Sequence, residues 1–106
     1  MEMSESSKIL TSDMSGNGVL RITMNNLDQK NALSERMMSE VMSEIRNANQ
    51  DKSIKVIILA ANGNVFCSGH DLKEIKAARE KKDSGAVFFQ KLFDHCSTMM
   101  ELIVNT

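Results

Sequence analysis

The sequence predicts an α/β fold, and three stretches of it carry that prediction. Residues 8–14 and 19–24 flank Ser15-Gly16-Asn17-Gly18, which is typical of a β-hairpin. Residues 34–49 place apolar side chains three and four positions apart, as in an amphipathic helix. Val56–Ala60 are apolar without interruption, which favours a buried strand. A chain of 106 residues with this alternation fits one small domain.

The N-terminal part of the chain is expected to be a tail followed by the hairpin. Residues 1–7 are mostly polar and lack periodicity, so we expect a flexible tail there and a domain over residues 8–106. In the second strand, alternation predicts one buried face. That face would consist of Leu20, Ile22 and Met24.

A helix is predicted from Ser34, as its N-cap, to about Asn49. Its apolar positions define one face, which we expect to pack on the sheet. They are Met37, Met38, Val41, Met42, Ile45 and Ala48, whereas Glu35, Glu40, Glu44 and Arg46 are expected to face water.

The stretch after the Val56–Ala60 strand begins with turn chemistry at Asn62-Gly63-Asn64. Residues 65–67 are apolar and are expected to return to apolar surroundings. Asp71 and Glu74 then have the spacing of a capping box at a helix start. Free N–H groups at a helix start can seat an oxygen that carries negative charge.

Two helices are predicted in the C-terminal part. The first runs through Ile75 and Ala78, and the charged run at residues 79–85 separates it from a second helix beginning near Ala86. The second helix has a broad apolar face that the few elements of a short chain cannot cover, and the Val56–Ala60 strand needs cover on both sides. We therefore expect an uncovered apolar surface. The face consists of Phe88, Phe89, Leu92, Phe93, Cys96, Met99, Met100 and Ile103.

Composition narrows the classes of function. The net charge of −1 gives no support for a nucleic-acid or membrane partner, and no apolar run reaches the length of about 20 residues that spans a bilayer. Cys67 and Cys96 are expected to be reduced thiols. Together with His70 and His95 they lack the paired spacing of zinc ligands, so no metal is predicted. The acidic N-terminus predicts a cytoplasmic protein, or a matrix protein only after removal of a transit peptide.

Two motifs resemble the crotonase (enoyl-CoA hydratase/isomerase) superfamily. The first is Phe66-Cys67-Ser68-Gly69-His70-Asp71-Leu72-Lys73-Glu74 after the Val56–Ala60 strand, and its Ser-Gly-His-Asp-Leu form is most similar to the enoyl-CoA hydratase domain-containing protein 3 subgroup. The second is Ile22-Thr23-Met24-Asn25-Asn26 followed by Asn31-Ala32-Leu33. Their spacing covers the chain from about Gly18. The resemblance implies the N-terminal part of a ββα spiral fold, without its C-terminal half.

The resemblance also implies a chemistry. The family stabilises the enolate of an acyl-CoA thioester with two backbone N–H groups, and the position in the motif assigns the first to the N–H of His70. It further implies coenzyme A contacts, with coenzyme A as part of the substrate and no separate cofactor. These contacts would come from Ser68, Gly69, His70, Asp71, Leu72 and Lys73, and from the turn Asn31, Ala32 and Leu33.

Some features depart from the family pattern. Asn26-Leu27 replaces the common Arg-Pro, and His70 replaces a small residue. The second oxyanion donor and the catalytic glutamates have no counterpart, so the family's hydratase or isomerase activity is not expected of this chain alone. The full-length family forms trimers or hexamers. Two alternatives to an acyl-CoA-binding portion of this family remain. The first is a non-catalytic oligomerisation or partner-binding module, and the second is a truncated product without a stable fold. The imidazole of His70 as a general base is a further alternative.

Overall fold

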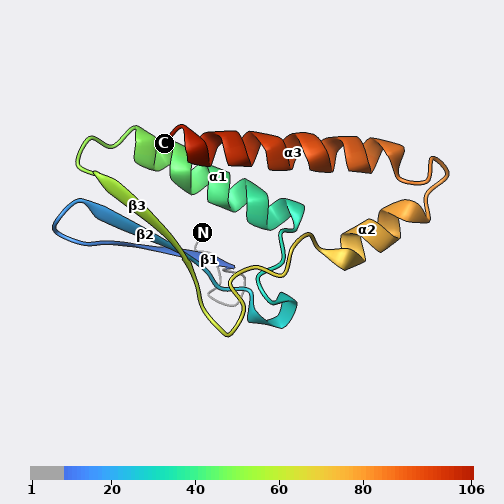
Figure 1. Ribbon diagram of the computed structural model, residues 1–106, viewed down its shortest axis with the longest axis horizontal. Helices are drawn as coiled ribbons and strands as arrows, with labels where there is room; N and C mark the ends of the chain where they lie inside the picture. Colours follow the sequence, from blue (N-terminus) through green and yellow to red (C-terminus); the bar gives the residue numbers. More distant parts are fainter. Residues whose placement is uncertain (1–8) are drawn as a thin grey trace, which may run out of the picture.

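The computed structural model describes residues 9–106, so the predicted tail at residues 1–7 lies outside the described residues. A three-stranded sheet carries helices on one side (Figure 1), which confirms the α/β class. In chain order the elements are β1 (Leu10–Met14), β2 (Val19–Met24), the 3-10 helix η2 (Leu27–Gln29), α1 (Glu35–Asn49), β3 (Val56–Ala61), α2 (Leu72–Arg79) and α3 (Ala86–Val104).

Strands β1 and β2 form the predicted antiparallel hairpin. The register pairs Leu10 with Met24 and Met14 with Leu20. Gly18 closes the turn with a φ of +81°, a left-handed conformation that glycine adopts at little cost. The buried face of β2 consists of the residues that alternation predicts, namely Leu20, Ile22 and Met24.

Helix α1 confirms both its predicted start and its predicted face. The Ser34 hydroxyl accepts a hydrogen bond from the Met37 N–H at 3.0 Å. Every apolar position expected on the buried face is buried. Apart from Ala48, each of these side chains contributes about 1.5–3 kcal/mol when it leaves water. Packing of this face on the sheet therefore stabilises the hairpin and the helix together.

Strand β3 returns parallel to β2 after the α1 crossover. Val19 pairs with Val56 at one end of the register, and Met24 pairs with Ala61 at the other. Because side chains alternate along a strand, Ile57, Leu59 and Ala61 lie on the face toward the core, and they pack against it.

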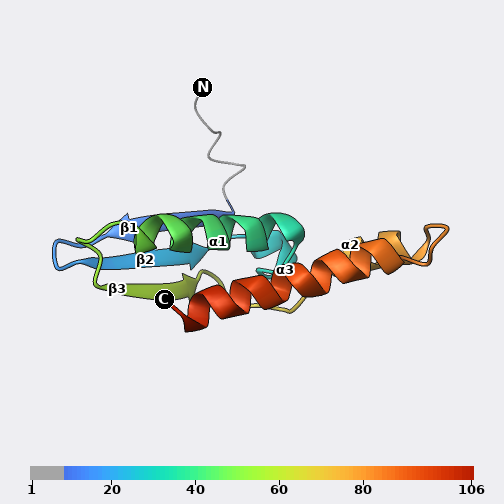
Figure 2. The ribbon, with the colours of Figure 1, turned by 90° about the horizontal axis from the view of Figure 1, so that it is seen from above.

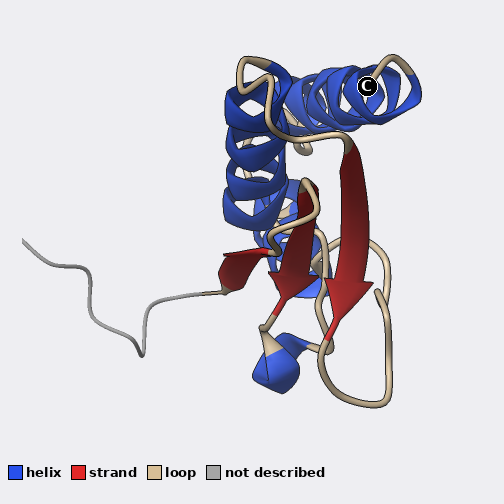
Figure 3. Cartoon of the chain, turned by 90° about the vertical axis from the view of Figure 1, so that its left-hand side faces the viewer, coloured by secondary structure: helices blue, strands red, loops and turns tan. Residues whose placement is uncertain are grey.

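The prediction that β3 is a buried strand is wrong for this chain. Val56 is 52% exposed and Ile58 is 40% exposed. Helices α1 and α3 both lie on one side of the sheet (Figure 3), so these two residues have no layer across them among residues 9–106. The result agrees with the expectation of an uncovered apolar surface.

Helices α2 and α3 occupy the C-terminal part. The break between them covers residues 80–85, one residue shorter than the predicted run 79–85, because Arg79 belongs to α2. Helix α3 runs alongside α1 on the β3 side (Figure 2). Leu92 and Met99 are buried there, whereas Phe93 is 62% exposed. The broad apolar face of α3 is thus only partly covered by α1.

Candidate functional site

The candidate site centres on residues 62–71, which connect β3 to α2 (Figure 1). Gly69 has a φ of +98°, a conformation that L side chains rarely adopt. A Cβ added at Gly69 would meet no atom within 4 Å, so the backbone here borders open space. Phe66, which was expected in apolar surroundings, is 55% exposed, because the described chain supplies no partner for its ring.

The structure brings the two sequence motifs into contact. Leu33 and His70 form a parallel bridge, and the Leu33 N–H donates to the Gly69 carbonyl at 2.6 Å. The Ser68 N–H donates to the Lys30 carbonyl at 3.1 Å. The turn at residues 30–33 therefore lies directly against the glycine loop, although more than thirty residues separate them in the chain.

The peptide between Gly69 and His70 has a fixed orientation. Its carbonyl is held by Leu33. In a planar trans peptide the N–H points opposite to the carbonyl, so the His70 N–H points away from the turn. That N–H donates to no acceptor within residues 9–106. An unpaired donor that points away from the turn can bind an oxygen of a ligand.

The His70 side chain takes a different position from its backbone. Its Nδ1 atom is buried, and it is the one buried side-chain nitrogen or oxygen of residues 9–106 that lacks a hydrogen-bond partner. A buried polar atom without a partner is costly. Because Nδ1 has no partner, no neighbouring acid orients the imidazole, as an oriented general base would require.

Asn31 is buried at 1% exposure and uses its whole side-chain amide. Its Nδ2 atom donates to the carbonyls of Asn62 at 3.0 Å and Val65 at 2.9 Å. Its Oδ1 atom accepts from the Asn26 N–H at 2.8 Å. The side chain therefore bonds to the protein itself. Sequence reasoning identified the residue but missed these contacts, which only a pairing of distant segments creates.

Asp71 is the N-cap of α2, as predicted. Its Oδ1 atom accepts from the N–H groups of Lys73 at 2.9 Å and Glu74 at 3.4 Å. These two donors are thereby occupied. Among the backbone donors at this helix start, the N–H groups of His70 and Leu72 donate to no acceptor within residues 9–106.

Glu74 does not complete a capping box, which corrects the sequence prediction. Its Oε1 atom instead accepts from the Glu35 N–H, at the start of α1, at 3.2 Å. Partial burial is the main cause that raises the pKa of Glu74; the hydrogen bond from Glu35 opposes it, and the charges of Asp71 and Glu35 add to it. The carboxylate joins the first turns of two helices.

The remaining predicted residues divide between surface and interior. Ser68, Leu72 and Lys73 are exposed, with Leu72 at 76%, whereas Ala32 is buried. The Ser68 hydroxyl donates to the Gln29 carbonyl at 3.3 Å. The exposed residues all lie in or just after the glycine loop, where a ligand could reach them.

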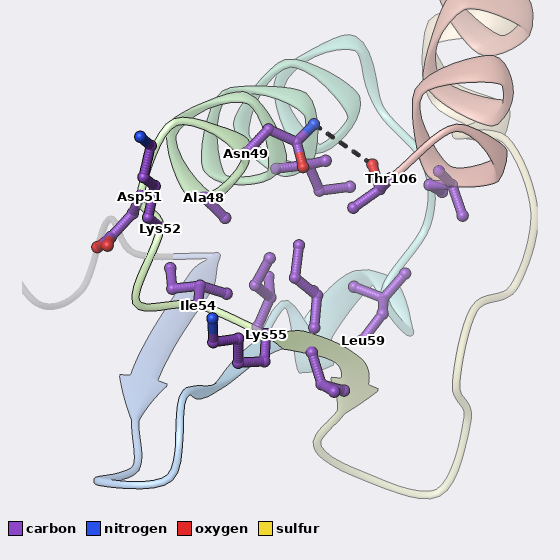
Figure 4. Close-up of a pocket in the computed structure, with 13 residues that line it drawn as sticks. Ala48, Asn49, Asp51, Lys52, Ile54, Lys55, Leu59 and Thr106 are labelled. Carbon is purple, nitrogen blue, oxygen red and sulfur yellow. Dashed lines mark hydrogen bonds between the residues drawn. The ribbon is translucent and has the colours of Figure 1, made fainter.

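A cavity of about 510 Å³ lies elsewhere, between the end of α1, β3 and the end of α3 (Figure 4). Apolar side chains such as Ala48, Ile54 and Leu59 line much of it. The Asn49 Nδ2 atom donates to the Thr106 Oγ1 atom at 3.5 Å across its rim. Ile22 of the second motif lines the cavity, but none of the candidate binding residues at positions 31–33 and 68–73 does, so the cavity is separate from the glycine loop.

Two negative findings apply to the part of the chain that the structure describes. No three His, Cys, Asp or Glu residues in it are grouped as metal ligands, and both cysteines are free and half-buried. None of its helices combines the length and hydropathy needed to cross a membrane.

Comparison with known proteins identifies the family. The model described as Enoyl-CoA hydratase/isomerase matches residues 14–105. The chain belongs to the enoyl-CoA hydratase/isomerase family. Over 102 residues it is 39% identical to the mouse (Mus musculus) protein named "Enoyl-CoA hydratase domain-containing protein 3, mitochondrial", with coverage of 96% of this chain and 32% of that protein. The resemblance seen in the motifs is confirmed.

Solved structures of enoyl-CoA hydratases share this fold. The enoyl-CoA hydratase of Mycobacterium smegmatis matches with a TM-score of 0.80 at 34% identity, over 92% of this chain and 36% of that one. Human enoyl-CoA hydratase domain-containing protein 3 matches with a TM-score of 0.75 at 30% identity, over 89% and 35%. The chain thus spans about a third of the length of these relatives.

Proposed function

We propose that this chain is the acyl-CoA-binding portion of an enoyl-CoA hydratase/isomerase family protein of fatty acid metabolism. The observation that carries the proposal is the His70 N–H, which is unpaired, directed away from the 30–33 turn and next to the open side of Gly69. Membership of the family supports the proposal. In this function the N–H donates to the thioester carbonyl and stabilises the charge of the enolate oxygen.

We assign the binding residues by their place in the two motifs. Ser68, Gly69, His70, Asp71, Leu72 and Lys73 follow the thioester and pantetheine path, with Lys73 near the phosphates. The turn Asn31, Ala32 and Leu33 forms the second wall. The contact between the turn and the loop supports this assignment, because one ligand can then touch both.

The chemistry available to this portion is limited. One backbone donor aimed at a developing oxyanion is typically worth about 2.7–4 kcal/mol in the transition state. No residue here matches the family's acid/base glutamates, so the portion polarises the thioester without moving its protons. Hydration or isomerisation requires groups that the motifs of this chain do not supply.

Calorimetric titration with a long-chain acyl-CoA tests the proposal. His70→Pro removes the N–H, and His70→Ala is the matched control because it keeps the N–H and removes the imidazole. We expect binding by the wild type and by His70→Ala, and loss of binding by His70→Pro with its circular dichroism unchanged. Equal binding by all three proteins would reject the role of the N–H, and absence of binding by the wild type would reject the function.

A non-catalytic oligomerisation or partner-binding module is the second candidate. The exposed apolar residues of α3, such as Phe93, and of the outer face of β3, such as Ile58, favour it, since exposed apolar surface can mark interaction sites. Sedimentation over a range of concentrations distinguishes the two. Self-association without acyl-CoA affinity would support the module and contradict the acyl-CoA function.

The location and assembly are part of the same proposal. We infer a cytoplasmic protein, or a matrix protein after removal of a transit peptide, and the name of the mouse relative places that protein in the mitochondrion. We also infer the homotrimer or hexamer typical of the family for the full-length protein. Fractionation and light scattering would test the two inferences.

A further inference from the structure

We propose that Asn31 is a positioning residue, whose buried amide holds the glycine loop so that the His70 N–H stays directed away from the turn and unpaired. The inference rests on the proposed function only in taking that N–H as the ligand-binding group. It adds a role for the Asn31 side chain inside the protein to the place of this residue in the proposed binding turn, since the residue is 1% exposed.

The amide uses its hydrogen-bonding groups within the protein. A side-chain amide has two N–H donors and one carbonyl oxygen. Here the nitrogen donates to the Asn62 and Val65 carbonyls at 3.0 and 2.9 Å, and the oxygen accepts from the Asn26 N–H at 2.8 Å. One side chain thus joins the start of the 26–33 turn to the first part of the loop after β3.

The turn joins the last part of the same loop through its backbone. Residues Lys30 and Leu33 bond to Ser68 and Gly69 at 3.1 and 2.6 Å. The loop is therefore held at residues 62 and 65 by the Asn31 side chain, and at residues 68 and 69 by the neighbouring backbone. Since the Gly69 carbonyl sets the direction of the His70 N–H, a shift of the turn reorients the donor.

The residue type fits the backbone as well as the hydrogen bonds. Asn31 has a φ of +56°, in the left-handed region, where asparagine is enriched among non-glycine residues. Aspartate at this position would keep the acceptor but lose both donors. Glycine would keep the backbone conformation and lose the side chain. Asn31→Gly therefore removes the hydrogen bonds without adding backbone strain.

The experiment follows backbone amide resonances of the ¹⁵N-labelled chain by NMR in the absence of ligand. We expect Asn31→Gly to shift or broaden the resonances of residues 65–71, while those of the α1 core stay in place. Asn62→Ala is the matched control, because it removes only the exposed bond between the Asn62 and Asn25 side chains at 3.1 Å. Unchanged resonances of residues 65–71 in Asn31→Gly would overturn the inference.

Asn31→Asp provides the second variant if Asn31→Gly fails to fold. It keeps the bond from the Asn26 N–H and loses the two bonds to the loop. We expect the same local perturbation, and unchanged resonances of residues 65–71 would again overturn the inference. Perturbation spread evenly over the α1 core would also overturn it, because a merely structural role affects the whole fold.

Affinity for butyryl-CoA then separates this inference from the proposed function. Loss of buried hydrogen bonds that hold the loop is expected to weaken ligand binding by about tenfold. We therefore expect about tenfold weaker binding of butyryl-CoA by Asn31→Gly, and unchanged binding by Asn62→Ala. If the wild type binds no acyl-CoA, the proposed function fails, and the NMR comparison still decides the positioning role. Wild-type affinity in Asn31→Gly would contradict the positioning role alone.

Discussion

Asp71 and Ser34 each hold backbone donors at the first turn of a helix, and both contacts are local. Ser34 accepts from Met37 and Asp71 accepts from Lys73 and Glu74. Such caps can be predicted from the sequence because donor and acceptor lie within three residues of each other. The contacts of Asn31 with Asn62 and Val65 cannot, since they join distant segments.

The cap of α2 gives a prediction at the residue scale. Asp71→Ala is expected to lower the free energy of unfolding by about 0.5–2 kcal/mol, because two N–H groups lose their acceptor. Urea denaturation measures the change. Asp71→Asn keeps an acceptor oxygen and should lose much less stability, and equal losses in the two variants would contradict the capping role.

Glu74 acts between elements, where its carboxylate joins α2 to the first turn of α1. The capping-box pattern predicted a partner within α2, and a local pattern carries no information about a competing donor on another helix. The amphipathic spacing of α1, by contrast, predicted its buried face in full. Burial of β3 was overestimated because an apolar run shows what a strand can bury, not what is present to cover it.

The raised pKa of Glu74 predicts a pH dependence. A carboxyl group whose pKa rises on folding stabilises the fold when protonated, so its contribution is present below the unfolded value of 4.5 and is lost as pH rises through the folded pKa. Glu74→Gln cannot titrate. We therefore expect the stability of the wild type to fall relative to Glu74→Gln as pH rises above 4.5.

Urea unfolding at several pH values checks that difference. Asp51 and Asp83 have lowered pKa values caused by hydrogen bonds from Ser53 and from Gly85 and Val87, so their contributions are lost only as pH falls below 3.8. Both carboxyls are present in the two proteins and cancel in the comparison. The role of Glu74 would be contradicted if, above pH 4.5, the free energy of unfolding of the wild type stayed constant or rose relative to that of Glu74→Gln.

The two faces of the sheet give a second prediction at this scale. Ile22 is fully buried, so Ile22→Ala is expected to cost about 2–5 kcal/mol of stability. Ile58 lies on the uncovered face at 40% exposure, and Ile58→Ala should cost clearly less. Denaturant titration of both variants measures the contrast. Similar losses would mean that the outer face of β3 is covered in solution.

At the scale of the whole molecule, residues 9–106 form one antiparallel hairpin, one parallel crossover and a helix pair with apolar surface left open. The sequence predicted this class and the open surface from periodicity. The two motifs lie on separate segments of the sequence. Their contact at Leu33 and His70 depends on the parallel pairing of β2 with β3. Periodicity does not specify which strands pair.

The proposed single oxyanion donor, with no counterpart of the family's glutamates beside it, predicts that this chain alone does not hydrate crotonyl-CoA. Loss of absorbance by the conjugated thioester follows the reaction. We expect the rate with the chain present to equal the rate in buffer. A rate well above buffer would show that residues of this chain supply the missing acid/base groups.

The hydrogen bond from the His70 N–H to the ligand is tested most directly by infrared spectroscopy of acyl-CoA labelled with ¹³C at the thioester carbonyl. A hydrogen bond from the His70 N–H would polarise the carbonyl and lower its stretching frequency. We predict a lowered frequency when the ligand is bound to the wild type and to His70→Ala, and no such component with His70→Pro. If the carbonyl of ligand bound to the wild type had the same stretching frequency as free ligand, the proposed hydrogen bond from the His70 N–H would be contradicted.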